Sequence, residues 1–293
     1  MLALDRRCHQ ILASLQDPFL HVITLEEVET PELFQARSER SWGEYCWTLK
    51  PFLPRFVFER DSSVDTVVYI DSDCWLPSPV APLLHRFEST TAACMLTPHA
   101  FSAHRDATAI AGVFCAQFMP FRRRNDAFKI LRWWQERCLE HCSSKPGQGP
   151  LGDQGYLTDW PERFGDSVFV LDQPSLTLAP WNIERFWRSA TRLPCLFHFQ
   201  GFRLFRLGGF LVIRASAGVP LQRSAVTHLH SPYLADILAM LARLPPGSLA
   251  PRPVPSLSQD LRGALLFLPR LLVLHWVVWF RPLPAALRGA AEH

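Results

Sequence analysis

The stretch Val64–Pro79 reads VDTVVYIDSDCWLPSP and decides the interpretation of the whole chain. Its first part, Thr66–Ile70, is a run of apolar residues typical of a strand that is buried on both faces of a sheet. This run leads directly into Asp71-Ser72-Asp73. Ligands of open α/β sheets bind beyond the carboxyl ends of the strands. The two carboxylates therefore mark the first candidate site.

Further apolar runs of β type recur along the chain and alternate with helical patterns. The runs are Phe19–Leu25, Ala93–Thr97, Ala111–Phe121, Val168–Leu171, Cys195–Phe199 and Phe210–Ile213. Apolar residues at helical spacing predict one helix over Asn125–Cys142, with Asn125 as its N-cap, and another over Tyr233–Leu244. The alternation predicts an α/β fold with a mainly parallel sheet flanked by helices over about residues 1–215.

Composition narrows the class of protein. The chain has 293 residues, of which 48% are hydrophobic and 19% charged, and its net charge is +3. This content supports a sizeable core, and the weak charge without a dense basic run argues against a nucleic-acid partner. The eight cysteines lie mostly in apolar stretches, and Met1–Leu15 contains no sustained apolar run. We therefore expect no secretory signal, a reducing compartment and a cytoplasmic location.

Aromatic and thiol pairs in the predicted helix Asn125–Cys142 also need an interpretation. Trp133 and Trp134 are adjacent, and Cys138 and Cys142 stand four residues apart. No further pair of Cys or His at metal-ligand spacing accompanies them, so we interpret them as helix core.

Taken alone, the polar residues of the candidate site allow two interpretations each. Asp71 and Asp73, at i and i+2 on an extended backbone, would point the same way and suit Mg²⁺ or Mn²⁺ carried by a diphosphate, or they would form an Asx turn that ends the strand. His198 in an apolar run is a metal ligand or a buried core histidine. Asp153-Gln154 follows the Gly/Pro-rich stretch KPGQGPLG and is a functional pair or a helix N-cap.

A set of segments gives these residues a context. In chain order they are EYCWTLKPFLPRFVFE (Glu44–Glu59), VVYIDSDCWL (Val67–Leu76), FMPFRR (Phe118–Arg123), LRWWQERCLEHC (Leu131–Cys142), GDQGYLTDWPERF (Gly152–Phe164), LAPWNIERF (Leu178–Phe186) and FHFQGFR (Phe197–Arg203). Their order and spacing resemble the GT-A glycosyltransferases, in particular the retaining glycogenin-like and lipopolysaccharide-galactosyltransferase-like group with its bacterial nucleotide-diphospho-sugar transferase relatives. The resemblance covers most of residues 1–245.

This resemblance implies a GT-A (Rossmann-like) fold and a metal-dependent hexosyltransferase. The enzyme would move a hexose from a nucleoside diphosphate sugar, expected to be a UDP-sugar, to a glycan or lipid acceptor with retention. Asp71, Asp73 and His198 would hold the metal, and the imidazole favours Mn²⁺ over Mg²⁺. The cation would neutralise the departing diphosphate. Asp153 would bond the hydroxyls of the donor sugar, and Gln154 would lie near its anomeric carbon.

The resemblance also implies residues that bind the donor. In the group, a lysine after the His-x-x-Gly motif contacts the diphosphate. Leu204 stands at that position here, so Arg203 or Arg206 would have to replace the lysine. The donor-binding candidates are Tyr45, Lys50, Asn182, Gly201 and Arg203.

Two departures from the group motivate alternatives. Met1–Leu15 reads as the end of a second strand with its helix, so one βα unit of about 30 residues is expected to be missing before it. Cys115-Ala116-Gln117 stands where the group has Asn-Ala-Gly, and Gln117 adds bulk beside the donor. The alternative from another class is therefore a non-catalytic, membrane-associated scaffold with a degenerate glycosyltransferase fold. A nucleotidyltransferase using the same metal and diphosphate chemistry is a third hypothesis.

The C-terminal part of the chain differs in composition. We expect a transferase domain at 1–245, a Pro-rich linker at 246–260 and a helical, apolar and basic tail at 261–293. Gly263–Phe280 is apolar except for Pro269, Arg270 and His275, which is marginal for a membrane span. Its arginines and tryptophans fit a helix in the headgroup layer, with 261–281 at the inner face of the plasma membrane, or a helix packed on protein.

Overall fold

The computed structural model of the chain describes residues 1–187, 192–207, 210–216, 222–248 and 276–282. It divides into two compact units. The central unit comprises Glu26–Phe186 and Pro194–His198, and the terminal unit comprises Met1–Leu25, Trp187–Leu193 and Phe199–His293. The predicted site residues lie in the central unit, except Gly201 and Arg203.

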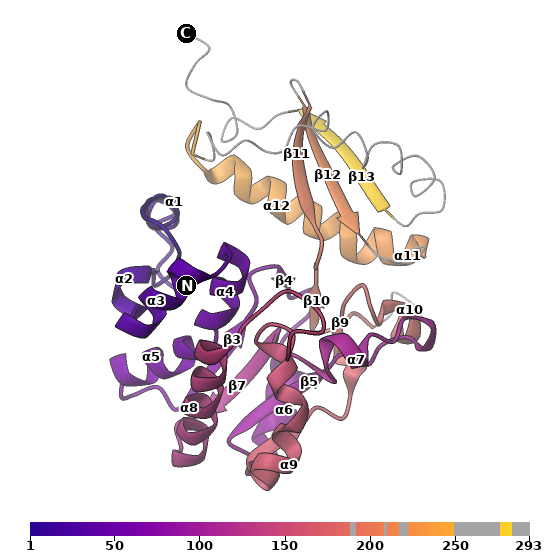
Figure 1. Ribbon diagram of the computed structural model, residues 1–293. Helices are drawn as coiled ribbons and strands as arrows, with labels where there is room; N and C mark the ends of the chain where they lie inside the picture. The colour runs from indigo at the N-terminus through magenta and orange to yellow at the C-terminus, as the bar shows by residue number, and fades with distance from the viewer. Residues whose placement is uncertain (188–191, 208–209, 217–221, 249–275, 283–293) are drawn as a thin grey trace. The chain divides into compact units, whose positions relative to one another are not determined.

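A five-stranded mixed sheet forms the middle of the central unit (Figure 1). Its strands are β3 (Thr66–Ile70), β5 (Cys94–Pro98), β6 (Phe114–Cys115), β7 (Phe118–Arg122) and β8 (Val168–Val170). The order is β3-β7-β5-β6, with β8 also paired to β5. Only the β5–β8 pairing is parallel, and the other three pairings are antiparallel. The prediction of a mainly parallel sheet is therefore wrong, because apolar residues on both faces of a strand report its burial and not its direction.

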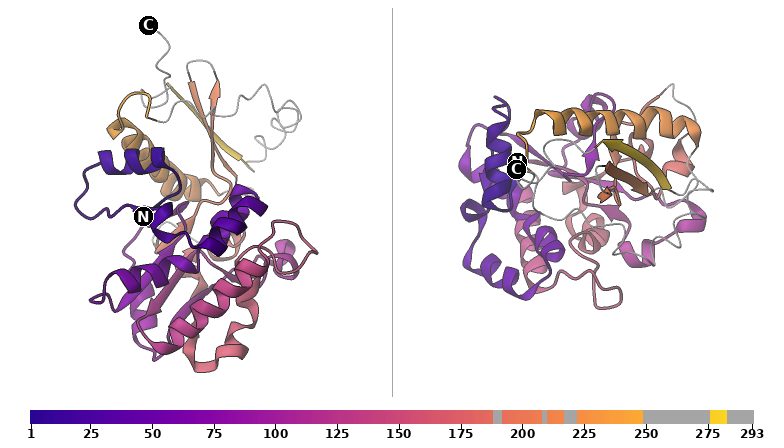
Figure 2. Two further views of the ribbon diagram at one scale, coloured as in Figure 1. Left: turned by 60° about the vertical axis from the view of Figure 1, so that its left-hand side comes forward. Right: turned by 90° about the horizontal axis from the view of Figure 1, so that it is seen from above.

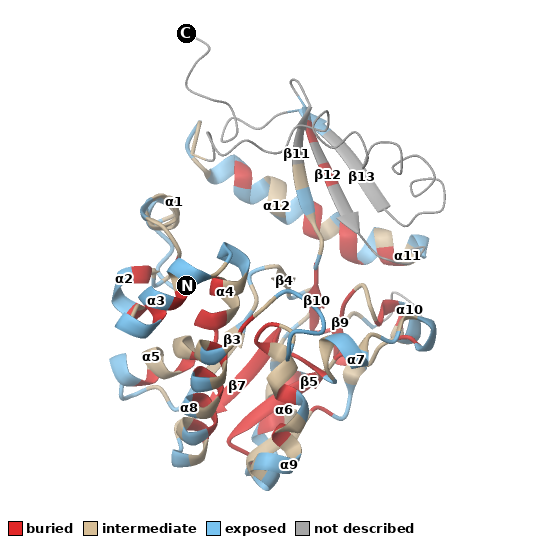
Figure 3. Ribbon diagram, viewed as in Figure 1, coloured by how far each residue is buried: buried red, intermediate tan, exposed pale blue. Residues whose placement is uncertain are grey.

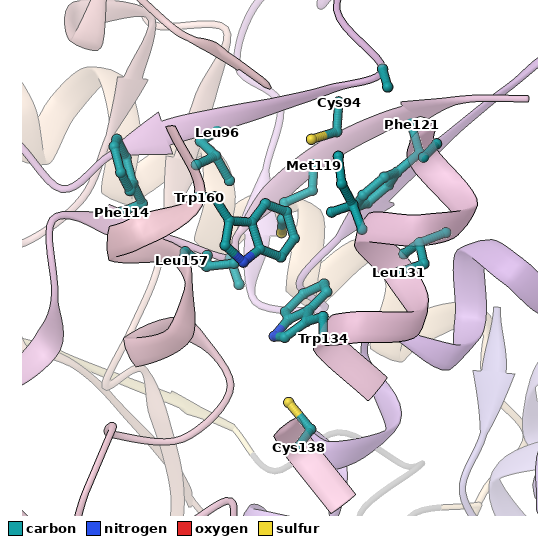
Figure 4. Close-up of a cluster of buried hydrophobic side chains, with 14 of the residues drawn as sticks. Cys94, Leu96, Phe114, Met119, Phe121, Leu131, Trp134, Cys138, Leu157 and Trp160 are labelled. Carbon is teal, nitrogen blue, oxygen red and sulfur yellow. The ribbon is translucent and has the colours of Figure 1, made fainter. Parts of the chain in front are cut away.

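Helices cover both faces of this sheet. On one face, Cys94 and Leu96 of β5 join a cluster with Trp134 of α8 (Asn125–Glu140) (Figure 4). On the other face, Met95 packs with Leu83 of α6 (Ala81–Glu88). Strands β5 and β7 are accordingly buried (Figure 3), whereas β3 lies at the end of the sheet and is exposed at both of its terminal residues. The expectation of a doubly buried strand before Asp71 is thus wrong for β3.

A second, three-stranded sheet of the central unit carries His198. Its strands are β4 (Cys74–Trp75), β9 (Thr177–Leu178) and β10 (Leu196–His198). Strand β10 runs antiparallel to β4 and parallel to β9, in a register that sets His198 opposite Cys74. The remaining helical elements that lie wholly in this unit are α3 (Pro31–Glu39), α4 (Trp42–Leu49), α5 (Phe52–Arg60), η1 (Ala103–Arg105), α7 (Thr108–Ala111), η2 (Gln154–Asp159), α9 (Trp160–Phe164), η3 (Gly165–Ser167), η4 (Pro174–Leu176) and α10 (Ile183–Phe186).

Local signals explain where the helices begin and end. Helix α4 starts with a reciprocal capping box between Ser41 and Glu44. Helix α8 starts at Asn125 as predicted, but its N-cap is Arg124 and no side chain caps it, so Asn125 is not the N-cap. Along α8, Trp134 and Cys138 are buried in the core, as expected. All eight cysteines are free thiols.

The described residues of the terminal unit form two small sheets. Strands β1 (Leu2–Ala3) and β2 (Ile23–Thr24) pair in parallel around α1 (Arg6–Ser14). An antiparallel sheet is packed against α12 (Ser231–Arg243) through Leu211, Ile213 and Leu234, and Figure 2 shows this helix beside the strands. The strands and the short elements that complete the described residues are α2 (Leu25–Val28, at the boundary of the units), β11 (Arg203–Leu207), β12 (Phe210–Ser216), β13 (Trp276–Pro282), α11 (Arg223–Ala225) and η5 (Val226–His230).

The predicted helical tail differs from the structure where it is described. Strand β13 pairs antiparallel with β12, with Ile213 opposite Trp279. The prediction of helix is wrong over Trp276–Pro282, because a run of β-branched and aromatic residues favours a strand once a partner strand is present. Residues 249–275 and 283–293 of the predicted linker and tail lie outside the described residues. Within the described part of the chain, no helix is long and apolar enough to cross a membrane.

Candidate active site

The segment after β3 is a tight turn. The N–H of Asp71 donates to the carbonyl oxygen of Gln117 at 3.0 Å, and the N–H of Cys74 donates to the carbonyl oxygen of Asp71 at 3.1 Å. The bond from residue i+3 back to residue i reverses the chain and leads it into β4. Asp71 and Asp73 are therefore not on an extended backbone, and each of them contacts different partners.

Asp71 belongs to a cluster with Lys50, Tyr69 and Asp153, which we call the lysine cluster. Lys50 follows α4 as its C-cap, and its Nζ lies 2.9 Å from Asp71 Oδ1 and 3.4 Å from Asp153 Oδ2. The hydroxyl of Tyr69 donates to Asp71 Oδ1 at 2.8 Å. One ammonium group thus lies between two carboxylates.

Burial and charge together set the protonation of the lysine cluster. Burial acts to lower the pKa of Lys50, but the carboxylates of Asp153 and Asp71 outweigh it and hold that pKa well above its ordinary value. Burial raises the pKa of Asp153 to about 6, with Lys50 opposing the rise. Lys50 is therefore charged at neutral pH, while Asp153 is the carboxyl group of the cluster that takes up a proton in mild acid.

Asp73 pairs with His198, and we call these two residues the histidine pair. Nε2 of His198 lies 3.0 Å from Asp73 Oδ1, and Nδ1 lies 3.0 Å from Oε1 of Gln117. The ring of Trp181 packs edge-on against the imidazole, with the centroids 5.2 Å apart. Burial raises the pKa of Asp73, but the hydrogen bond and charge of His198 outweigh this and bring the pKa below its ordinary value.

The histidine pair fits a divalent cation. Ligand atoms of Asp73, Cys74 and His198 all lie within 4.8 Å of one another. Burial, strengthened by the nearby carboxylates, raises the pKa of the Cys74 thiol in the metal-free chain. The carboxylate oxygen of Asp73 and the imidazole nitrogen of His198 are donors that suit Mn²⁺ when further oxygen ligands complete the shell.

Asp153 and Gln154 open the short helix η2. Asp153 occupies the N-cap position, but its side chain makes no capping hydrogen bond, and its carbonyl oxygen accepts from Nε1 of Trp134 at 2.9 Å. The side chain contacts Lys50 instead, so Asp153 does not cap the helix through its side chain, and its role toward a donor sugar stays a prediction. Gln154 is the first residue of η2 and is half-buried.

Two other candidates are engaged with the protein itself. The hydroxyl of Tyr45 donates to Glu29 at 2.6 Å. Oδ1 of Asn182 accepts from the N–H of Ala179 at 2.9 Å, and Nδ2 donates to the carbonyl oxygen of His99 at 3.0 Å. Asn182 therefore organises the loop after β9, and neither side chain joins the lysine cluster or the histidine pair.

The diphosphate candidates belong to the terminal unit. Gly201 has a φ of +83°, a left-handed conformation that favours glycine. Arg203 is exposed at the start of β11 and donates to the carbonyl oxygen of Phe202. Leu204 packs in the core of the terminal unit. Arg206 lies in β11, and its side chain is outside the described residues.

Sequence reasoning missed two contributions to the site. Tyr69 was interpreted only as part of an apolar strand, yet its hydroxyl bonds Asp71. Gln117 was interpreted only as bulk at a glycine position, yet its side chain is fully buried and contacts His198. The available signal was a single amide in the otherwise apolar run Ala111–Phe121.

Fold and site together define a mixed α/β protein whose central unit brings an Asp–Lys–Asp cluster and an Asp–His pair to the end of β3. The chain belongs to the family of the Bacillus subtilis (strain 168) protein YfnD. The two are 31% identical over 221 residues, which cover 70% of this chain and 68% of YfnD. YfnF of the same organism is 29% identical over 224 residues, which cover 70% of this chain and 72% of YfnF. Both relatives are described as uncharacterized proteins.

Two further comparisons give no information on the fold or activity of the chain. No protein-family model matches the chain. Among solved structures, the apo form of mouse xyloside xylosyltransferase 1 is similar at a TM-score of 0.39 and 15% identity, over 61% of this chain and 75% of that chain. A likeness of this strength supports no argument about fold or activity.

Proposed function

We propose that the chain is a metal-dependent glycosyltransferase of the GT-A type. It transfers a hexose from a nucleoside diphosphate sugar, with UDP as the expected nucleotide, to a hydroxyl of a glycan or lipid acceptor with retention. The observation that carries the proposal is the 3.0 Å distance between His198 of β10 and Asp73 of the turn after β3, with Lys50 between Asp71 and Asp153 in the same unit. The order of the sequence motifs supports the same function.

Each part of the site has a task in this transfer. The bond between the anomeric carbon and the diphosphate oxygen breaks, the acceptor oxygen bonds the anomeric carbon, and the hydroxyl proton passes from the acceptor to the departing diphosphate. A divalent cation bound at the histidine pair supplies charge neutralisation for the departing diphosphate. Asp73 provides an anionic oxygen and His198 a nitrogen. Asp71 is already held by Lys50 and Tyr69, so it joins this set only by giving up one of those contacts.

The lysine cluster serves the donor sugar in this proposal. Asp153 is buried, and its Oδ2 contacts the ammonium of Lys50 without a hydrogen bond among the described residues. A carboxylate held in this way can accept hydrogen bonds from sugar hydroxyls, and Gln154 follows it in the chain as the contact proposed near the anomeric carbon. Tyr45, Asn182, Gly201 and Arg203 remain proposals as donor-binding residues.

Calorimetry of UDP binding to the full chain, with and without Mn²⁺, tests the proposal. We expect UDP to bind only when Mn²⁺ is present, and Asp73→Asn to abolish the binding. Asp172→Asn is the matched control, because Asp172 is an exposed aspartate paired with Arg86 on the surface. Incubation with UDP-sugars should then release UDP. Binding of UDP without metal, or release of pyrophosphate in place of UDP, would contradict the proposal.

A further inference from the structure

A surface pocket of the central unit lies outside the candidate active site. Its volume is about 320 Å³, and the side chains that matter below are Trp133, Arg137, Tyr156, Asp159 and Arg163. They come from α8, η2 and α9. The volume is within the range of about 300–1,000 Å³ that is usual for pockets that bind small ligands. No residue of the lysine cluster or the histidine pair lines this pocket.

Part of the pocket wall is aromatic. Trp133 is half-buried, whereas its neighbour Trp134 is fully buried in the core. The rings of Trp133 and Tyr156 meet edge-on, with their centroids 6.2 Å apart. Pro150 also lines the pocket and packs closely on Gly155, since a Cβ at position 155 would lie 2.9 Å from Cβ of Pro150. This wall offers an apolar surface to the C–H groups of a ligand.

The charged groups of the pocket compensate one another. Nε and Nη2 of Arg163 donate to Oδ2 of Asp159 at 2.9 and 2.6 Å. Arg163 also stacks on Trp133, with Cζ 4.5 Å from the ring centroid. Arg137 pairs with Glu140. Because each guanidinium already has a carboxylate partner, the pocket has no uncompensated positive charge for an anion such as phosphate.

One donor and one acceptor of the pocket have no partner. Nε of Arg137 and Oδ1 of Asp159 are buried and make no hydrogen bond within the described part of the chain. Buried polar atoms are nearly always paired, so these two atoms indicate a polar ligand. The side chains are 33% and 42% exposed, so a small rotation of either one brings its atom to a ligand in the pocket.

We propose that this pocket is a saccharide-binding site that takes one neutral pyranose ring. The C–H groups of the ring contact the aromatic wall. One hydroxyl accepts from Nε of Arg137 and another donates to Oδ1 of Asp159, since a sugar hydroxyl both donates and accepts. The inference goes beyond the transfer reaction proposed above and does not depend on it.

Saturation-transfer-difference NMR on the full chain gives the first test. The probes are the methyl glycosides of glucose, galactose, mannose and N-acetylglucosamine. We expect at least one of them to bind with a dissociation constant of about 1–10 mM. Asp159→Asn and Arg137→Met should each weaken this binding by about tenfold, because each variant removes one hydrogen-bonding partner of the ring.

The matched control variants are Glu59→Gln and Arg55→Met. Arg55 and Glu59 form a surface ion pair four residues apart on a helix, as Asp159 and Arg163 do four residues apart, but they do not line the pocket. Both controls should bind the glycoside as the wild type does. Circular dichroism checks that all four variants are folded.

The indole N–H signal of Trp133 tests where the glycoside binds. In ¹H–¹⁵N spectra of the ¹⁵N-tryptophan-labelled chain, this signal is assigned by its loss in Trp133→Phe, and it should shift as the glycoside is added. The signal of Trp187, whose indole donates to Ser224 in the terminal unit, should stay in place. Inorganic phosphate at the same concentrations should move neither signal.

The results that would overturn the saccharide site are specific. They are the absence of binding by all the glycosides, or binding that Asp159→Asn and Arg137→Met leave unchanged. A Trp133 signal that moves with phosphate but with no glycoside would also overturn the site, in favour of an anion site. A chain that binds no UDP but shows the glycoside-dependent shift of Trp133 would overturn the proposed transferase function while supporting the saccharide site.

Discussion

The lysine cluster and the histidine pair contain Asp71 and Asp73, which are separated by a single residue in the chain, but the two groups balance charge in different ways. Asp71 is satisfied from within the protein, by an ammonium at 2.9 Å and a phenol at 2.8 Å. Asp73 faces an imidazole nitrogen whose neighbour Nδ1 is already bonded to Gln117. Two acidic residues of one short motif therefore have different partners: Asp71 is held by Lys50 and Tyr69, whereas Asp73 pairs with His198 and is the carboxylate that we propose as a ligand of a cation.

The largest effect is expected from removing the positive charge of the lysine cluster. Lys50→Met leaves Asp71 and the buried Asp153 without their positive partner. Loss of one member of a buried ion pair costs about 3–5 kcal/mol of unfolding free energy. Urea unfolding followed by tryptophan fluorescence measures the effect. The double variant Lys50→Met/Asp153→Asn should recover part of the lost unfolding free energy. The absence of any recovery would contradict a stabilising ion pair between Lys50 and Asp153.

The pH dependence of the unfolding free energy tests the raised pKa of Asp153 in the lysine cluster. Its pKa is raised from the ordinary 3.8 to about 6 in the folded chain. The folded state holds this proton more tightly than the unfolded state does. The contribution of Asp153 to the unfolding free energy is therefore fully present below pH 3.8 and is lost as the pH rises through about 6. A rise of this size corresponds to about 3 kcal/mol.

The matched measurement compares wild type with Asp153→Asn by urea unfolding between mild acid and neutral pH. The wild type should lose stability relative to the variant as the pH rises over this range. A constant difference between the two proteins would show that Asp153 titrates as an ordinary carboxyl group.

A smaller effect is expected from Tyr69→Phe. The substitution removes one hydrogen bond to a carboxylate that keeps its lysine partner, so we expect a loss of about 1.5 kcal/mol of unfolding free energy. Mn²⁺ affinity should stay at the wild-type level, since Tyr69 contacts Asp71 and not the histidine pair. A large fall in Mn²⁺ affinity would show that the two regions are not independent.

Local structure was predictable where local forces decide it. The run Thr66–Ile70 forms β3 with the predicted bounds, and α8 begins at the predicted residue. The direction of the strands was not predictable, because a central strand such as β5 is apolar whether its neighbours run parallel or antiparallel. The strand Trp276–Pro282 was missed for a related reason, since its partner β12 stands more than fifty positions earlier in the chain.

The candidate site was predicted as a set of residues but not as a set of contacts. Asp71 and Asp73 were predicted as a candidate site from their position after an apolar strand, and His198 was predicted as a third ligand from the family resemblance. Their different partners depend on a turn closed by Asp71 and Cys74 and on an amide 81 positions before His198. Contacts of this kind arise from tertiary packing, which periodicity and composition do not encode.

The most direct test of the account compares the Mn²⁺ affinities of Asp73→Asn and Asp71→Asn in the full chain, each measured against the wild type. We expect Asp73→Asn to weaken binding at least about tenfold more than Asp71→Asn, because Asp73 lies 3.0 Å from Nε2 of His198 whereas Asp71 is held by Lys50 and Tyr69. Equal losses in the two variants, or a wild type that binds no Mn²⁺, would contradict the account.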